Sequence, residues 1–173
     1  MTVDVNGDGR PEVVCGHYIF DAATGTLLLN GKLEPTGRGY GAPHEAAPCY
    51  YMLALADIDH DNQQEICAGN TIYKPIITNT AGTDGNTWSV LRQANRDDHI
   101  GYYDGQTFMS DFDNDGDVDV CVIACNPSNA HTAYVYVWDG QTSEIISYKS
   151  INFPSLYGNS QTPSIPFCGD SKR

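Results

Sequence analysis

A nine-residue acidic segment occurs three times in this chain, at residues 4–12, 57–65 and 111–119. Each copy carries an oxygen-bearing side chain at positions 1, 3, 5 and 9, and Gly or Asn at position 6. Carboxylates packed this densely repel one another unless a cation lies among them. Gly and Asn adopt the left-handed backbone that a tight wrap around an ion needs. Three copies in register favour a built ion site over three solvated acidic turns.

The predicted ion is Ca²⁺, which takes about six to eight oxygen ligands from carboxylates, carbonyls and water. Position 7 would supply only its backbone carbonyl, so its side chain is free to vary. About three calcium sites are expected. Their candidate metal ligands are Asp4, Asn6, Asp8, Arg10, Glu12, Asp57, Asp59, Asp61, Gln63, Glu65, Asp111, Asp113, Asp115, Asp117 and Asp119.

The three segments differ from EF-hand loops, which carry a bidentate Glu at position 12 and lie between helices. Position 12 is Cys15, Ala68 or Val122 here, and each segment runs into a β-rich stretch. We therefore expect the ninth-position carboxylate to close the ion site where a strand begins.

The charge balance agrees with this prediction. The chain has 22 acidic and 9 basic residues and a formal net charge of −13, and three divalent ions would bring it to −7. With no basic patch, the composition argues against nucleic acid as a partner. No apolar run reaches the length of a membrane span.

The loops start at residues 4, 57 and 111, and this regular period is typical of a repeat protein. The stretches between them read as short strands separated by Gly, Pro, Asn and Asp, without an amphipathic helix. The fold class is therefore all-β. We expect one domain over residues 1–173, with repeat units at about 1–48, 49–104 and 105–160 and a spare strand at 161–170. About four antiparallel strands per repeat is the pattern of a propeller blade.

A second repeated element supports the period. Residues 18–28 and 136–146 each read as a strand with an aromatic residue near its end, a polar turn and a returning aliphatic strand. Residues 102–107 repeat the turn chemistry, while residues 72–77 hold the corresponding place in a degenerate middle repeat.

The acidic loops resemble those of FG-GAP or VCBS-type repeats, found in integrin-α-like propellers, and the hairpins are also similar to propellers of rhamnogalacturonan lyases. The resemblance implies a β-propeller that binds Ca²⁺ between adjacent strands. The first and third loops match the repeat pattern, whereas the second has Asn62 where Gly is expected. The likeness is specific for calcium and architecture, but not for function.

Three blades are too few to close a propeller. The first loop begins at residue 4, which predicts that its repeat lacks an inner strand, whereas residues 161–170 offer a spare one. Either the chain is part of a longer propeller, or the spare strand completes the first blade of a neighbouring copy. Such head-to-tail strand addition would give a homo-oligomer, as a ring or a filament.

The preferred function is a non-enzymatic, calcium-stabilised structural or adhesive β-repeat protein, outside the cell or at its surface. Millimolar calcium there fills weak loops. The candidate carbohydrate contacts are the aromatic residues Tyr40, Trp88, Tyr102, Tyr103 and Tyr157, although packing between blades is the commoner role of such side chains.

The alternative function is a fragment of a secreted polysaccharide lyase or carbohydrate-binding propeller. A lyase needs a base, and a cation or Arg for the substrate carboxylate. Arg92, Arg96, Asp97, Asp98 and His99 cluster in one connection, but a solvated loop would have the same composition. No catalytic motif is present, so no catalytic residue is assigned.

Overall fold

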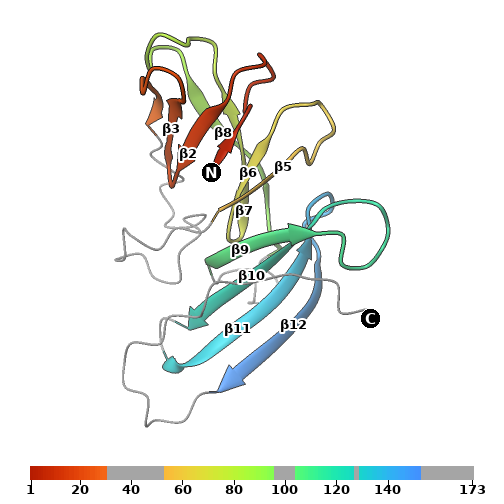
Figure 1. Cartoon of the computed structure of the whole chain (residues 1–173). Helices are drawn as coiled ribbons and strands as arrows, with labels where there is room; N and C mark the ends of the chain where they lie inside the picture. The colour runs from red at the N-terminus through yellow and green to blue at the C-terminus, as the bar shows by residue number, and fades with distance from the viewer. Residues whose placement is uncertain (31–52, 96–103, 127–128, 153–173) are drawn as a thin grey trace, which may run out of the picture.

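The computed structural model describes residues 1–30, 53–95, 104–126 and 129–152, and these residues form an all-β structure. Three antiparallel sheets of four strands each follow one another along the chain, and none closes into a barrel. Figure 1 shows the middle sheet between the other two. The predicted fold class, blade-like repeats in an open arrangement, is confirmed.

Each sheet is an up-and-down meander of consecutive strands. The first sheet consists of β1 (Thr2–Val3), β2 (Glu12–Cys15), β3 (Tyr18–Asp21) and β4 (Leu27–Asn30). The second consists of β5 (Ala54–Ala56), β6 (Glu65–Ala68), β7 (Thr71–Ile76) and β8 (Thr87–Gln93). The third consists of β9 (Gly105–Ser110), β10 (Asp119–Asn126), β11 (Asn129–Asp139) and β12 (Ile145–Asn152).

The prediction that the first repeat lacks an inner strand is wrong. Thr2 and Val3 form β1 and pair with Val13 and Glu12 of β2. The amino group of Met1 extends the pairing by donating to the Val14 carbonyl at 2.8 Å. A strand of two residues is too short to show alternation in a sequence, which is why it escaped the pattern.

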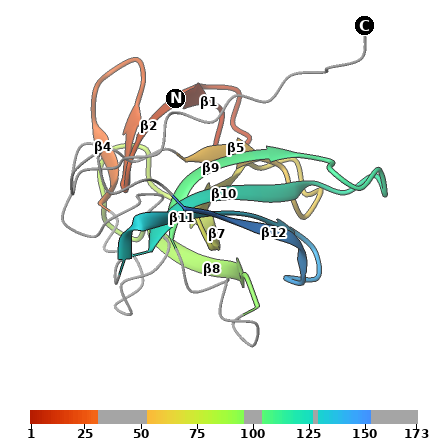
Figure 2. The ribbon, with the colours of Figure 1, turned by 90° about the horizontal axis from the view of Figure 1, so that it is seen from below.

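Apolar side chains fill the spaces between successive sheets. Val5, Val14, Ile19 and Leu29 of the first repeat pack with Ile66 of β6. A larger cluster joins the second and third sheets, with members Ala54, Ile58, Cys67, Ile72, Ala94, Val120, Val122, Ala124, Tyr136 and Trp138. Figure 2, seen from below, shows the third sheet in front of the second. Each sheet is therefore stabilised by its neighbour, as in a row of propeller blades.

Hydrogen bonds between the sheets make this apolar packing specific. The indole Nε1 of the fully buried Trp138 donates to the Gly69 carbonyl at 3.3 Å. The amide of Gly69 donates to Thr107 Oγ1 at 2.6 Å, which ties the β6–β7 turn to β9. Asn86 Nδ2 donates to the Leu28 carbonyl at 2.7 Å and links the first two sheets. These bonds fix which strands of adjacent sheets face each other.

Residues 105–107 do not form the turn that the sequence suggested, because Gly105 begins strand β9. A Cβ atom at Gly105 would lie 2.1 Å from the Ile123 carbonyl oxygen of β10. The glycine is thus required by close backbone approach, not by a turn. Residues 102 and 103 lie outside the described residues.

The expected spare strand, 161–170, also lies outside the described residues, so strand addition stays a prediction.

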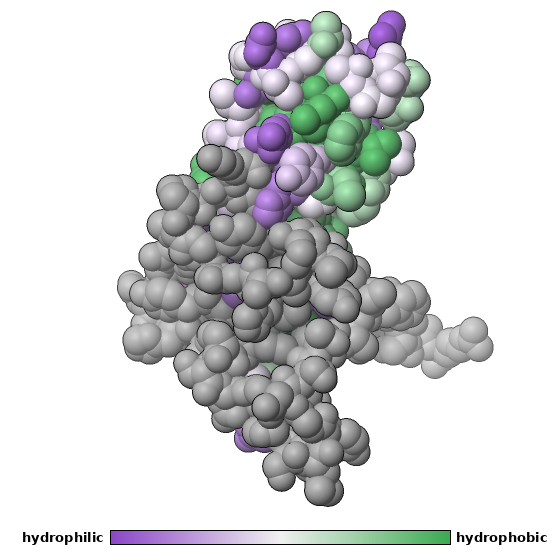
Figure 3. All heavy atoms as spheres, turned by 90° about the vertical axis from the view of Figure 1, so that its left-hand side faces the viewer, coloured by the Kyte–Doolittle hydropathy of each residue, from purple (hydrophilic) through white to green (hydrophobic). Residues whose placement is uncertain are grey.

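Figure 3 shows apolar side chains gathered on part of the surface at the end of the molecule that carries the first sheet. Exposed large apolar residues of the first two sheets include Met1, Tyr18, Ile76 and Val90. Cys67 and Cys121, which follow the second and third loops, are buried, whereas Cys15 is exposed.

Candidate metal centre

The three acidic loops occupy the same place in their sheets, joining β1 to β2, β5 to β6 and β9 to β10. Position 6 of each loop is left-handed, with φ of 85° at Gly9, 67° at Asn62 and 100° at Gly116. The predicted need for Gly or Asn at this position is confirmed. Asn62 keeps the backbone conformation in the loop that departs from the glycine pattern.

Position 4 is left-handed as well, with φ of 75° at Gly7, 60° at His60 and 65° at Asn114. This second left-handed residue was not predicted. The signal was present in two copies, since Gly7 and Asn114 are residue types that favour this conformation. His60 hid it in the second loop, because a sequence pattern with one exception among three copies carries little weight.

The Asp at position 1 braces its own loop. Asp4 Oδ1 accepts the amides of Gly7 and Asp8 at 2.7 and 3.1 Å, and Oδ2 accepts that of Gly9 at 2.8 Å. In the third loop, Asp111 Oδ1 and Oδ2 accept the amides of Asn114 and Gly116. The loop backbone is therefore held in shape by its own carboxylate.

Position 5 braces position 7 in all three copies. Asp8 Oδ1 accepts the amide of Arg10 at 2.8 Å, and Asp61 Oδ1 accepts that of Gln63 at 2.9 Å. Asp115 Oδ1 likewise accepts the amide of Asp117 at 2.9 Å. At position 3, Asn6 Oδ1 and Asp113 Oδ1 accept the amide two residues ahead. These side chains therefore contact the backbone of their own loops.

The ninth-position carboxylates are buried at the start of β2, β6 and β10, with Glu12 and Asp119 1 % exposed and Glu65 0 %. Each accepts the amide of position 2 of its own loop, from Val5 at 2.8 Å and from Ile58 and Phe112 at 2.7 Å. Their place at the start of a strand is as predicted, and their closing of an ion site stays a prediction.

Burial is the main cause that raises the pKa of Glu12, Glu65 and Asp119 above the ordinary values of 4.5, 4.5 and 3.8. Neighbouring acids, such as Asp8 for Glu12 and Asp113 for Asp119, raise the pKa further. Backbone hydrogen bonds partly offset both effects. Burial and neighbouring acids thus disfavour the ionised form of each carboxylate, which a nearby cation would stabilise.

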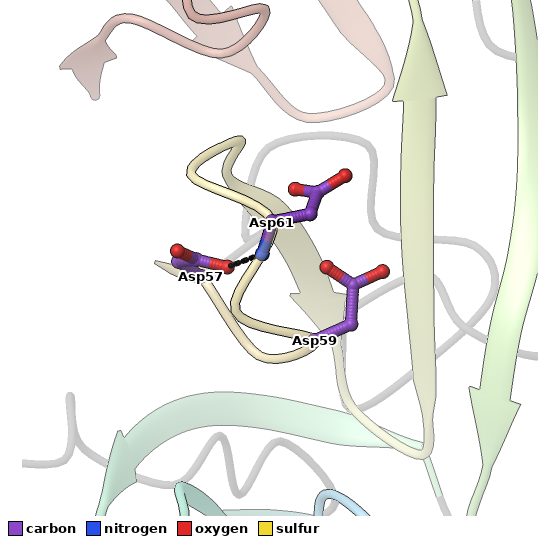
Figure 4. Close-up of side chains that lie close together, drawn as sticks. All are labelled: Asp57, Asp59 and Asp61. Atoms are coloured by element: carbon purple, nitrogen blue, oxygen red, sulfur yellow. Dashed lines mark hydrogen bonds between the residues drawn. The ribbon is translucent and has the colours of Figure 1, made fainter.

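Carboxylates converge in two of the loops. Asp57, Asp59 and Asp61 each offer an oxygen within 4.8 Å of the others, and Asp111, Asp113 and Asp115 do the same. Figure 4 shows the carboxylates of Asp59 and Asp61 on the same side of the second loop. Both triplets could hold a metal ion. The first loop has a neutral Asn6 in place of the second aspartate, which lowers its charge.

A lysine that sequence reasoning missed faces the second loop. Lys74 Nζ on β7 lies 2.6 Å from Asp59 Oδ2, 2.5 Å from Asp61 Oδ2 and 3.5 Å from Glu65 Oε1. Burial alone would lower the pKa of Lys74, but the hydrogen bonds to Asp59 and Asp61 and the charge of Glu65 raise it above its ordinary value. The hydrogen bond from Lys74 is also the main cause that lowers the pKa of Asp61.

The third loop has no such lysine or arginine in the described part of the chain. Its single ion-pair contact there joins Asp117 Oδ1 to His60 Nε2 at 3.5 Å. The three converging side chains Asp111, Asp113 and Asp115 are exposed. Of the three loops, this one combines the most acids with the least neutralisation, so it is the strongest candidate for a divalent cation.

Replacing the buried acid of the third loop should have different effects on stability in chelator and in calcium. In chelator, replacing Asp119 by Asn should not lower the stability near pH 7. The amide oxygen can still accept the Phe112 amide, and a buried ionised group is lost. The pKa of Asp119 is raised on folding, so the protonated carboxyl contributes to the stability of the wild type in acid. The wild type loses this contribution as pH rises from 3.8 through the raised pKa of the folded state. The advantage of the variant should thus vanish in acid.

With calcium present, the same variant should lose affinity, because a charged ligand is gone. Urea unfolding in chelator at two pH values, and again with calcium, checks both signs. Asp117→Asn is the matched control, with the same charge change at a position whose side chain is not an expected ligand. A marked loss of stability for Asp119→Asn in chelator near pH 7 would contradict this account.

Of the residues considered for a polysaccharide lyase, the structure describes only Arg92. Arg92 lies on β8, and its guanidinium donates to Gln141 Oε1 at 3.1 Å as part of the contact between the second and third sheets. Residues 96–99 lie outside the described residues. Trp88 packs edge-on against Tyr73, with ring centroids 5.9 Å apart, and so serves packing. The four tyrosines named with it as carbohydrate contacts lie outside the described residues.

The chain matches no known protein-family profile, no curated protein and no solved structure. Among the described residues there is no helix of the length and hydrophobicity that crossing a membrane requires.

Proposed function

We propose that this chain is a calcium-stabilised β-repeat module with a structural or adhesive role, and not an enzyme. The observation that carries the proposal is the shared architecture of the three loops. Each carries oxygen-bearing side chains at positions 1, 3, 5 and 9, has a left-handed backbone at positions 4 and 6, and ends with a buried carboxylate. Ca²⁺ fits such a set better than Mg²⁺, which demands near-octahedral geometry and keeps its water.

The positions of the loops in the fold support a stabilising role. Each loop ends on a strand whose side chains enter the core between sheets, as Val14 follows Glu12 and Val120 follows Asp119. An ion bound there would neutralise the buried acid at the edge of that core. It would compensate for short strands that bury little apolar surface on their own.

The expected location is outside the cell or at its surface. Loops built from exposed carboxylates bind calcium weakly, and about 10⁻⁴–10⁻³ M is typical of extracellular modules. Such sites fill where calcium is millimolar. The likeness to FG-GAP or VCBS-type repeats supports the same proposal, since those repeats carry calcium in loops of this pattern.

Titration calorimetry with calcium chloride tests the proposal. The wild type should take up calcium with a dissociation constant of about 10⁻⁴–10⁻³ M and should respond far less to magnesium. Replacing both Asp113 and Asp115 by Ala should remove one site. The control Asp84→Asn, in the exposed connection between β7 and β8, should bind like the wild type. A chain that takes up no calcium at about ten times these concentrations would refute the proposal.

A further inference from the structure

Lys74 has a position in its sheet that can be compared across the three repeats. Asp21 on β3 pairs with Glu12, and Asp139 on β11 pairs with Asp119. In the middle sheet Ile66 pairs with Tyr73, which places Lys74 opposite Glu65. The residue across from the ninth-position carboxylate is therefore an acid in two repeats and a lysine in one.

The two acids accept hydrogen bonds from backbone amides of the hairpin turns that follow them. Asp21 Oδ1 accepts the amides of Ala23 and Thr24 at 3.0 and 2.6 Å. Asp139 Oδ1 accepts those of Gln141 and Thr142 at 2.6 and 2.9 Å. Their negative charges add to the field of the first and third loops, which leaves the demand for an external cation in place.

Lys74 acts in the opposite way. Its ammonium contacts carboxylates from positions 3, 5 and 9 of the second loop, namely Asp59, Asp61 and Glu65. These are three of the four side-chain ligands that a bound Ca²⁺ would use. The lysine side chain is only 20 % exposed, and that of Glu65 is 0 % exposed. A divalent ion at this point would have to displace the ammonium and leave it without its partners.

We infer that Lys74 is a built-in counter-cation of the second loop and that it restricts calcium binding to the first and third loops. This inference rests on the proposed function, because it assigns the calcium sites among the three loops. Lys74 is thus a specificity-determining residue. It sets the number of ions per chain at two, and it keeps the middle loop folded at calcium concentrations that empty its neighbours.

The inference explains two atoms of the second loop. Asp59 Oδ1 and Glu65 Oε1 are buried and accept no hydrogen bond from the described part of the chain. Buried carboxylate oxygens of this kind need a nearby positive charge. Lys74 Nζ supplies it at 3.5 Å from Glu65 Oε1 and bonds the other oxygen of Asp59. In the second loop the protein itself provides the charge that the other loops obtain from solution.

A site-resolved titration with calcium chloride tests the inference. The backbone amide signals of Gly9, Asn62 and Gly116 report the three loops separately in two-dimensional NMR. In the wild type, Gly9 and Gly116 should respond at sub-millimolar to millimolar calcium. Asn62 should need at least about a tenfold higher concentration. In Lys74→Met, Asn62 should respond together with Gly116, and the number of bound ions should rise from two to three.

The matched control is Lys149→Met on the exposed strand β12, which removes one positive charge without touching a loop. It should leave Asn62 unresponsive. In chelator, Lys74→Met should melt below Lys149→Met, and calcium should restore it. Should Lys74→Met fail to fold in chelator, refolding on addition of calcium, with Asn62 responsive, supports the same conclusion.

The outcomes separate the two proposals. A wild type in which Asn62 titrates together with Gly116 overturns the role of Lys74 while the proposed function stands. A wild type in which no loop responds refutes the proposed function. In that case a response of Asn62 gained in Lys74→Met still supports the counter-cation, and no gain overturns it.

Discussion

Removing calcium is expected to lower the melting temperature of the wild-type protein by about 6 to 20 °C relative to about 10 mM calcium. An ion that binds only the folded state at about 10 to 100 times its dissociation constant adds about 1.4 to 2.7 kcal/mol per site. Two filled loops therefore add about 3 to 5 kcal/mol. For a chain of this size each kcal/mol moves the midpoint by about 2 to 4 °C.

Differential scanning calorimetry with calcium chloride and with excess chelator measures this shift directly. The variant with Asp113 and Asp115 both replaced by Ala should retain about half of the calcium-dependent shift, because the first loop is untouched. Magnesium at the same concentration should restore little of the shift. Identical melting curves in calcium and in chelator would mean that the loops are acidic turns without an ion.

Replacing Trp138 by Ala is expected to destabilise the protein by about 3 to 5 kcal/mol. The indole is fully buried in the cluster between the second and third sheets, and its Nε1 donates to the Gly69 carbonyl. The substitution leaves a large cavity and also removes the indole donor, so that the Gly69 carbonyl keeps only the Cys67 thiol contact at 3.8 Å. Urea unfolding in calcium should show the loss as a lower midpoint.

Two comparison variants separate the effect of the cavity from those of the lost hydrogen bond and of removing any aromatic ring. Trp138→Phe keeps most of the apolar volume and loses the hydrogen bond, so its loss should be clearly smaller. Tyr148→Ala removes an aromatic ring from the same sheet at a position 61 % exposed, and should change stability by about 0.5 kcal/mol or less. If Trp138→Ala were as mild as Tyr148→Ala, the contact between these two sheets would not support the fold as described.

The all-β architecture could be predicted because it depends on local patterns. Short β-branched runs, such as those that become β6 and β10, stand between turn residues, and the acidic loops mark the same junction in every repeat. The two-residue strand β1 could not be predicted in this way. It forms because the loop at residues 4–12 folds the chain back and aligns Val3 with Glu12.

The converging carboxylates of the second and third loops and the left-handed position 6 were predictable, but the charge balance of the second loop was not. Lys74 reaches the second loop through cross-strand pairing, and register is not readable from composition. A numerical hint existed, since Asp21 and Lys74 each lie 17 residues after the first Asp of their loop. The longer hairpin between β10 and β11 moves Asp139 away from that spacing and conceals the correspondence.

The hydrogen bonds of the Asp at position 1 bear on how quickly the proposed calcium sites would fill. Because Asp4 and Asp111 use both oxygens to hold amides of their own loops, the binding conformation exists before an ion arrives. At the proposed calcium sites, uptake would then proceed at the pace of diffusion and dehydration, without waiting for a chain rearrangement. The module would follow fluctuations of calcium in its surroundings almost without delay, in the manner of a buffer.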